Sequence, residues 1–124
     1  MRRLTAAVLV AVSVLLTAGH SVAVGPDDGV WLVHQTAPGY PAFQYYVSVH
    51  QNGTTVVIMS AYGDGTWDFG IGTRSGATVQ GTLYDSITGA AYGTATVTLT
   101  SSTTFSGSAN VAGVVLSLAG SKLF

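Results

Sequence analysis

The sequence has no cysteine, no glutamate and little charge of either sign: only 7% of its 124 residues are charged. Because cysteine is absent, no disulfide can form, so stability has to come from burial and backbone hydrogen bonding. Two of the four basic residues, Arg2 and Arg3, stand at the start, and the remaining chain carries two basic residues against five aspartates. A chain with this net negative charge cannot hold a phosphate backbone, so nucleic-acid binding is excluded.

A long apolar run occurs only near the start of the sequence. Arg2 and Arg3 precede an almost unbroken series of Ala, Val and Leu over residues 4–18, and Ser21-Val22-Ala23 resembles a cleavage site. The run is shorter than the about 20 residues that a membrane-spanning helix needs. The pattern therefore predicts a signal peptide, with an uncleaved anchor as the alternative.

This interpretation divides the chain into a signal peptide at 1–23, a leader at 24–28 and one domain at 29–124. The export pattern is typical of bacteria. It predicts a secreted protein, extracellular or periplasmic.

The rest of the chain lacks helical periodicity, and its apolar and polar residues alternate with a period of two, which is typical of half-buried strands. Hydrophobic residues make up 48% of the sequence, which excludes disorder despite the low charge. Asn52-Gly53 predicts a type I′ hairpin turn, and Gly63-Asp64-Gly65 predicts a second turn. The pattern as a whole predicts eight strands, at 29–36, 42–51, 54–62, 66–74, 77–85, 90–100, 103–109 and 113–124.

Nearly all the predicted connections are short, which favours pairing between consecutive strands over a Greek-key sandwich. The expected fold is therefore all-β: an eight-stranded antiparallel up-and-down barrel, preceded by the signal peptide. Residues 37–41 contain two prolines and a glycine, so no ladder is expected to pass through them. Tyr40 in this loop is a candidate for a lid over the barrel.

Alternation also assigns side chains to the two faces of the sheet. Four large aromatic residues are expected to fill the barrel, namely Phe43, Tyr45, Trp67 and Phe69, whereas Ala91, Gly93, Ala95 and Gly107 would leave space. The outer face is expected to carry Gln44, Tyr46, Ser48 and His50 on one strand and Tyr92, Thr94, Thr96 and Thr98 on another. This face is polar but almost uncharged.

The motif Gly29-Val30-Trp31 opens the first strand, and Lys122 lies near the end of the last. This Gly-x-Trp opening resembles that of the calycin barrels, the lipocalin and avidin group. The resemblance implies structural roles for Gly29 and Lys122, with Trp31 buried at a closed end and Lys122 above its indole in a cation–π contact. Nothing in the sequence matches the biotin-contacting pattern of avidins. The turn Tyr62-Gly63-Asp64-Gly65-Thr66-Trp67 also resembles that of small exported bacterial barrels.

No catalytic constellation stands out. His34 and His50 lie on different strands without a metal-type spacing, so they are expected to be exposed and hydrogen-bonded to neighbours. The scattered aspartates suggest no glycosidase pair, and no serine occupies a Gly-x-Ser-x-Gly elbow. The protein is therefore expected not to be an enzyme and to use neither metal nor cofactor.

Two functions of different class remain, with the candidate residues Trp31, Tyr40, Tyr46, Tyr62, Trp67 and Tyr92. The favoured hypothesis is a structural or interaction module in which Tyr46 and Tyr92 contact another protein, an envelope surface or a second copy of the chain. The alternative is a binder of a small apolar or aromatic ligand in the barrel mouth. A small outer-membrane barrel is a third, weaker interpretation. A cavity larger than about 300 Å³ would favour the ligand binder.

Overall fold

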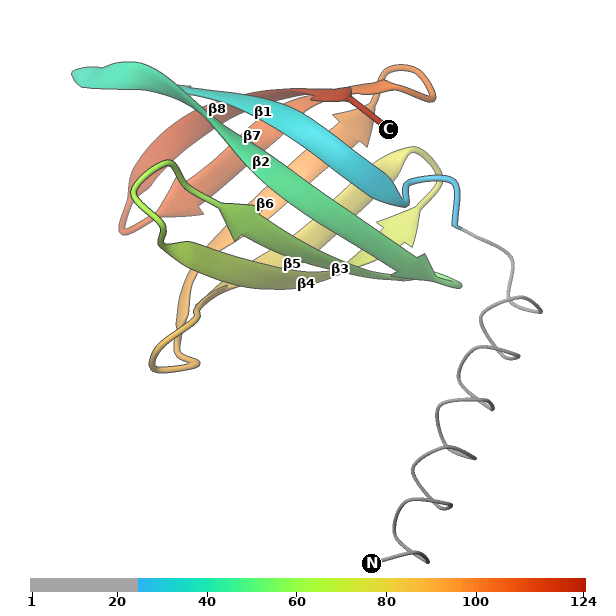
Figure 1. Ribbon diagram of the computed structural model, residues 1–124, viewed down its shortest axis with the longest axis horizontal. Coiled ribbons are helices and arrows are strands. Elements are labelled where there is room, and N and C mark those ends of the chain that lie inside the picture. The colour runs from blue at the N-terminus through green and yellow to red at the C-terminus, as the bar shows by residue number, and fades with distance from the viewer. Residues whose placement is uncertain (1–24) are drawn as a thin grey trace, which may run out of the picture.

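The computed structural model describes residues 25–124, so the predicted signal peptide and the first leader residue lie outside the described residues. The described chain forms a closed barrel in which each strand pairs with the next in sequence (Figure 1). The strands are β1 (Gly29–Ala37), β2 (Tyr40–Asn52), β3 (Thr55–Ala61), β4 (Trp67–Ser75), β5 (Thr78–Asp85), β6 (Ala91–Leu99), β7 (Thr104–Val111) and β8 (Val114–Lys122). The predicted eight-stranded antiparallel up-and-down barrel is confirmed.

Pairing between the first and last strands closes the barrel. Trp31 on β1 faces Val47 on β2 and Lys122 on β8. Every strand therefore has two neighbours, and no sheet edge is left unpaired. Over residues 25–124 no helix is long and apolar enough to span a membrane.

The two ends of the barrel differ in their connections. The turns β2–β3, β4–β5 and β6–β7 lie at one end together with residues 25–28 and the C-terminus, on the right in Figure 1. We call this end the base. The turns β1–β2, β3–β4, β5–β6 and β7–β8 lie at the other end, on the left in Figure 1, which we call the mouth.

The buried core lies inside the base half of the barrel. It consists of alternate residues of the first three strands, which is the expected period of two: Trp31, Val33, Val47, Val49 and Val56. Phe105 on β7 and Leu118 on β8 pack against this cluster. The ring centroids of Trp31 and Phe105 are 5.4 Å apart, so an aromatic pair joins β1 to β7 inside the barrel.

The prediction that no ladder passes through residues 37–41 is wrong. Ala37 pairs with Tyr40, and β1 and β2 project beyond the barrel as a hairpin. The register shift places Pro41 and Ala42 opposite Thr36 alone, which is a β-bulge. Because a bulge leaves one residue outside the ladder, it accommodates a proline that has no N–H to donate.

The turn after β2 also differs in type from the expected one. Asn52 is paired with Thr55 inside the ladder, and only Gly53 has a positive φ, of 61°. A two-residue turn with glycine at its first central position fits type II′ rather than type I′.

The expected inward orientation of Trp67 and Phe69 on β4 is wrong. Trp67 and Ile71 are 45% and 46% exposed on the outside, while Gly70 is buried. The ladder pairs Ile58 with Gly70 and Ser60 with Asp68, so the glycine face of β4 continues the inner face of β3. A Cβ on Gly70 would lie 2.9 Å from Ile58 Cγ1, so the inner face has no room for a larger side chain there.

Candidate functional site

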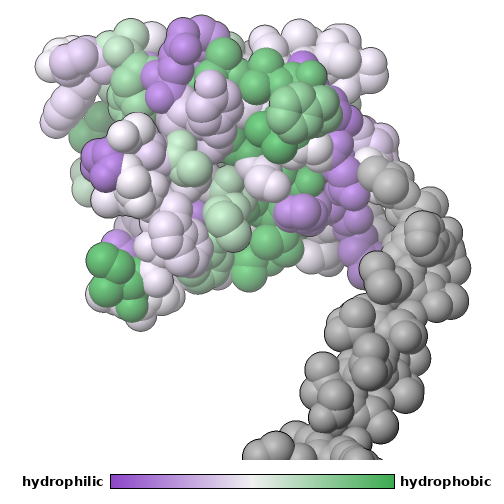
Figure 2. Space-filling model, in the orientation of Figure 1, coloured by the Kyte–Doolittle hydropathy of each residue, from purple (hydrophilic) through white to green (hydrophobic). Residues whose placement is uncertain are grey.

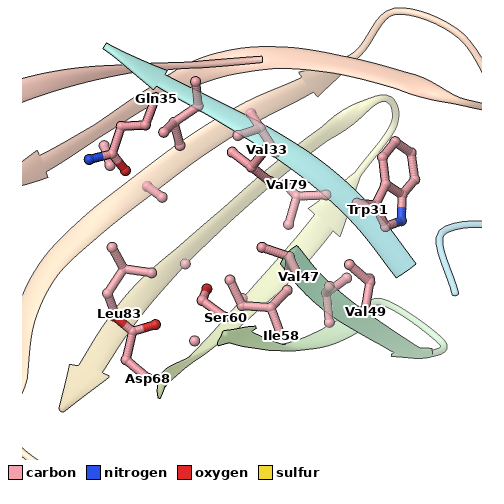
Figure 3. A pocket seen from close by; sticks show the side chains of 18 of the residues that line it. Trp31, Val33, Gln35, Val47, Val49, Ile58, Ser60, Asp68, Val79 and Leu83 are labelled. Atoms are coloured by element: carbon pink, nitrogen blue, oxygen red, sulfur yellow. The ribbon is translucent and has the colours of Figure 1, made fainter. Parts of the chain in front are cut away.

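The barrel encloses a cavity of about 360 Å³. Its wall is largely apolar and comes from all eight strands. Figure 3 shows part of this wall. Small residues make the space: Gly70, Gly72 and Gly81 line it from β4 and β5, and Ala95 and Ala109 line it from the adjoining strands β6 and β7. Of the four aromatic residues expected to fill the barrel, Phe43 and Tyr45 line the cavity, whereas Trp67 and Phe69 belong to the outer face of β4.

The base of the cavity is closed by the leader and by Trp31. The indole is 2% exposed, and its Nε1 donates a hydrogen bond of 3.0 Å to the Asp27 carbonyl. Lys122 Nζ lies 5.9 Å from the centroid of the Trp31 ring, as expected, and 3.4 Å from the Pro26 carbonyl oxygen. A cation above the indole face gains a favourable electrostatic contact.

Among residues 25–124, Asp27 is the one charged side chain that is buried, and it lies in this base. It is 6% exposed, and its Oδ1 lies 3.3 Å from Arg74 Nη1, while Oδ2 has no hydrogen-bond partner among the described residues. Burial raises the pKa of Asp27, and the positive charges of Arg74 and Lys122 oppose that rise. The base is therefore tightly closed, with both cations of the described chain held against the leader.

The mouth end of the cavity is more open than the base. Phe43 lines the cavity and is 45% exposed, and Gln35, Tyr62 and Asp68 are half-buried, whereas Val33 and Val49 are buried. Figure 3 shows Gln35 and Asp68 at one end of the cavity and Trp31 and Val49 at the other. The cavity therefore opens to solvent between the mouth turns.

A cluster of polar side chains stands inside this mouth. Asp68 Oδ2 accepts a hydrogen bond of 2.7 Å from the Tyr62 hydroxyl and a second one from the Tyr92 hydroxyl. The Tyr45 hydroxyl donates to Gln35 Oε1 at 3.1 Å, and the rings of Tyr45 and Tyr62 are 5.1 Å apart. We call these five residues the mouth cluster.

The tyrosines of the mouth cluster stay protonated well into alkaline solution. Burial, followed by the hydrogen bond to Asp68, raises the pKa of both Tyr62 and Tyr92. Burial and the negative charge of Asp68 raise the pKa of Tyr45. At neutral pH the three hydroxyls are hydrogen-bond donors, and those of Tyr62 and Tyr92 hold the Asp68 carboxylate in place.

The prediction that Tyr92 faces outward is wrong. Leu83 pairs with Gly93 and Tyr84 pairs with Ala91, so Tyr92 is the extra residue of a β-bulge on β6. The bulge reverses the alternation at this point: Tyr92 turns into the cavity, and Ala91, expected inside, is exposed. Tyr92 and Tyr46 consequently do not share an outer surface.

Three of the six candidate residues line the cavity, Trp31 at its base and Tyr62 and Tyr92 at its mouth. Tyr40, Tyr46 and Trp67 are outside, with exposed fractions of 64%, 55% and 45%. Sequence analysis missed Asp68, although it alternates with Gly70 and Gly72 and would follow from a correct choice of the inner face of β4.

The two strand histidines are exposed and hydrogen-bonded to neighbours, as predicted. His34 Nδ1 lies 3.0 Å from Gln44 Nε2, and His50 Nε2 lies 3.1 Å from Ser48 Oγ. Residues 25–124 contain no group of three or more His, Cys, Asp or Glu side chains placed to hold a metal ion.

No protein-family model and no curated protein matches the chain. Among solved structures, the chain is similar to a redesigned β-barrel, b11L5F_LGL, with a TM-score of 0.63 and 18% identity over 80% of this chain and 93% of that one. It is also similar to the redesigned β-barrel mFAP1 bound to DFHBI, with a TM-score of 0.61 and 17% identity over 78% of this chain and 94% of that one. At these identities the similarity establishes the fold, an eight-stranded antiparallel barrel.

Proposed function

We propose that the protein is a secreted, non-catalytic, calycin-like barrel that binds a small apolar or aromatic molecule in its cavity. The observation that carries this proposal is the cavity of about 360 Å³, which exceeds the lower limit of about 300 Å³ typical of ligand pockets. The sequence alone favoured an interaction module over a ligand binder, and the cavity reverses that order. A module that serves only as a scaffold has no need of an open, apolar interior.

The position of the polar groups supports the same function. Ligand pockets combine an apolar wall with a few polar groups that fix orientation, and the mouth cluster provides such groups at one end of the cavity. An apolar interior also argues against a membrane barrel, whose interior is polar. The redesigned barrel mFAP1, of similar fold, is bound to DFHBI, so a barrel of this kind has room for a small molecule.

An interaction module is the second candidate, supported by apolar side chains on the outer face of β2, β3 and β4. Tyr46, Met59, Trp67 and Ile71 are each 45% or more exposed there. Tyr46 and Trp67 flank Ala61, and Met59 lies beside Phe69, so these side chains occupy adjacent positions of the ladder. Figure 2 shows apolar side chains among polar ones on the face turned to the viewer. Sedimentation of the mature chain tests whether this face binds a second copy.

A cavity-filling variant tests the ligand proposal. Ala95 and Ala109 are paired across β6 and β7, and both line the cavity, so Ala95→Leu with Ala109→Leu places two large side chains inside it. Naphthylmethanol, a neutral aromatic probe, is titrated into the mature chain by calorimetry. We expect the wild type to bind it and the double variant to bind at least about tenfold more weakly, because the space is filled.

The matched control is Ala61→Leu, which adds the same side chain to an exposed position outside the barrel. This variant is expected to bind like the wild type. Binding that survives cavity filling, or that is lost equally in the control, would place the probe elsewhere. Failure of the wild type to bind any aromatic probe would contradict the proposed function.

A further inference from the structure

The charges of the described chain are divided unequally between the two ends of the barrel. Arg74 and Lys122, its two cations, are both at the base, where they contact Asp27 and the Pro26 carbonyl. The mouth carries Asp64 in the β3–β4 turn, Asp68 at the start of β4 and Asp85 at the end of β5. Over residues 25–124 the mouth therefore has three carboxylates and no lysine or arginine.

Two of these carboxylates are occupied by their own turns. Asp64 Oδ1 accepts hydrogen bonds from the Thr66 amide and hydroxyl. Asp85 Oδ1 accepts the amides of Ile87 and Thr88. These bonds lower the pKa of both groups, so both carry a full negative charge at neutral pH. They contribute to the potential at the mouth without facing the ligand.

Asp68 is different because it lines the cavity itself. Its Oδ2 accepts hydrogen bonds from the hydroxyls of Tyr62 and Tyr92, and no described residue donates a hydrogen bond to its Oδ1. Two donors on one oxygen fix the orientation of the carboxylate and leave the second oxygen for a ligand. The rings of Tyr45 and Tyr62 stand beside it, and aromatic faces attract cations.

From this arrangement we infer that the ligand is a lipophilic cation, with an apolar or aromatic body in the barrel and an ammonium-type head on Asp68 Oδ1 among the mouth tyrosines. This inference rests on the proposed function and names the chemical class of its ligand. An anionic head would meet three carboxylates without a compensating cation. A neutral head would gain one hydrogen bond to Asp68 but no attraction from the negative potential of the three carboxylates. This potential concentrates cations at the entrance of the barrel.

The test compares three probes with the same aromatic body at neutral pH. Naphthylmethylamine is cationic, naphthylmethanol is neutral and naphthylacetate is anionic. Calorimetric titration of the mature wild-type chain is expected to give tightest binding for the amine and weakest for the acetate. Binding of the amine, but not of the alcohol, is expected to weaken as salt is added, because salt screens the field of the mouth.

The variant Asp68→Asn keeps the shape of the side chain and removes its charge. We expect it to weaken binding of the amine by about ten- to a hundredfold, the range for a hydrogen bond to a charged partner, while the alcohol binds about as before. The matched control is Asp64→Asn with Asp85→Asn, which removes two charges from the mouth but none from the cavity. It should weaken amine binding only by about two- to fivefold.

The outcomes separate the two proposals. If the acetate or the alcohol binds the wild type as tightly as the amine, the inferred cation is wrong, and the proposed function stands. If Asp68→Asn affects all three probes equally, Asp68 does not bind the head group. If no probe binds, the proposed function itself fails. If Asp68→Asn still binds the alcohol, the variant is folded. If the variant does not fold, the inferred cation is tested on the wild type alone, by the order in which it binds the three probes and by the salt dependence of amine binding.

Discussion

The indole of Trp31 donates its hydrogen bond to the carbonyl of Asp27 across four residues, and this contact holds the leader over the base of the barrel together with the ion pair between Asp27 and Arg74. Gly29 stands between them with a φ of 144°, and a Cβ there would lie 2.3 Å from the Phe124 carbonyl oxygen. The Gly-x-Trp motif thus has a local physical reason. Glycine lets the C-terminus approach, and the tryptophan closes the end of the barrel.

The first prediction concerns the two tryptophans, which form a natural pair of test and control. Trp31→Phe removes the hydrogen bond to Asp27 and leaves space in the core, so the free energy of unfolding should fall by about 2–3 kcal/mol. Trp67→Phe alters an exposed ring and should change it by less than about 0.5 kcal/mol. Urea unfolding of both variants gives the comparison. Equal effects would show that Trp31 does not hold the base.

A second prediction follows from the raised pKa of Asp27. A carboxyl whose pKa is higher in the folded state stabilises the fold while it is protonated, and this stabilisation is lost as the pH rises through the folded pKa. Asp27→Asn is permanently neutral. The stability of this variant relative to the wild type should therefore increase as the pH rises above 3.8, the ordinary pKa of Asp. Denaturant unfolding of both proteins across acidic to neutral pH measures the difference, and a constant difference would contradict the raised pKa.

The strand number and topology were predictable because they depend on local properties. A period of two marks each strand, and connections of a few residues force consecutive strands to pair. Burial of Trp31 was implied by the resemblance of its Gly-x-Trp motif to that of the calycin barrels. These features depend on neighbours in sequence.

The cavity was not predictable, because it depends on which face of a strand turns inward. On β4 the face of Trp67 and Phe69 is the more apolar one, yet register with β3 places the face of Asp68 and Gly70 inside. The bulge that turns Tyr92 inward leaves no mark in the alternation of β6. Both errors concern the register between neighbouring strands. Because of them, the sequence did not predict that the residues of the mouth cluster lie together.

The third prediction concerns close approach of two strands at Gly107. A Cβ at this position would lie 2.2 Å from the Thr96 carbonyl oxygen and 2.6 Å from Val97 Cα, both backbone atoms. Gly107→Ala should therefore destabilise the barrel by about 2 kcal/mol or more. Gly63→Ala is the control, since that glycine is exposed, has no atom within 4 Å of the added carbon and should be neutral. Thermal unfolding distinguishes the two, and similar melting temperatures would contradict the close approach.

The last prediction concerns the two tyrosines that hold Asp68. Tyr62→Phe with Tyr92→Phe removes both hydrogen bonds to the carboxylate, so at neutral pH the free energy of unfolding should fall by about 2–4 kcal/mol. The pKa values of both hydroxyls are raised in the folded state, so the stability they provide is present below the ordinary tyrosine pKa of 10.0 and is lost as the pH rises above it. The wild type should therefore lose stability steeply in that range, and the variant more gradually. Denaturant unfolding at a series of alkaline pH values measures how steeply the free energy of unfolding falls with pH in the wild type and in the variant. The phenolate absorbance is recorded alongside. Equal slopes would show that neither hydroxyl is held protonated by the fold, and the assignment of Tyr62 and Tyr92 as donors to Asp68 would then be wrong.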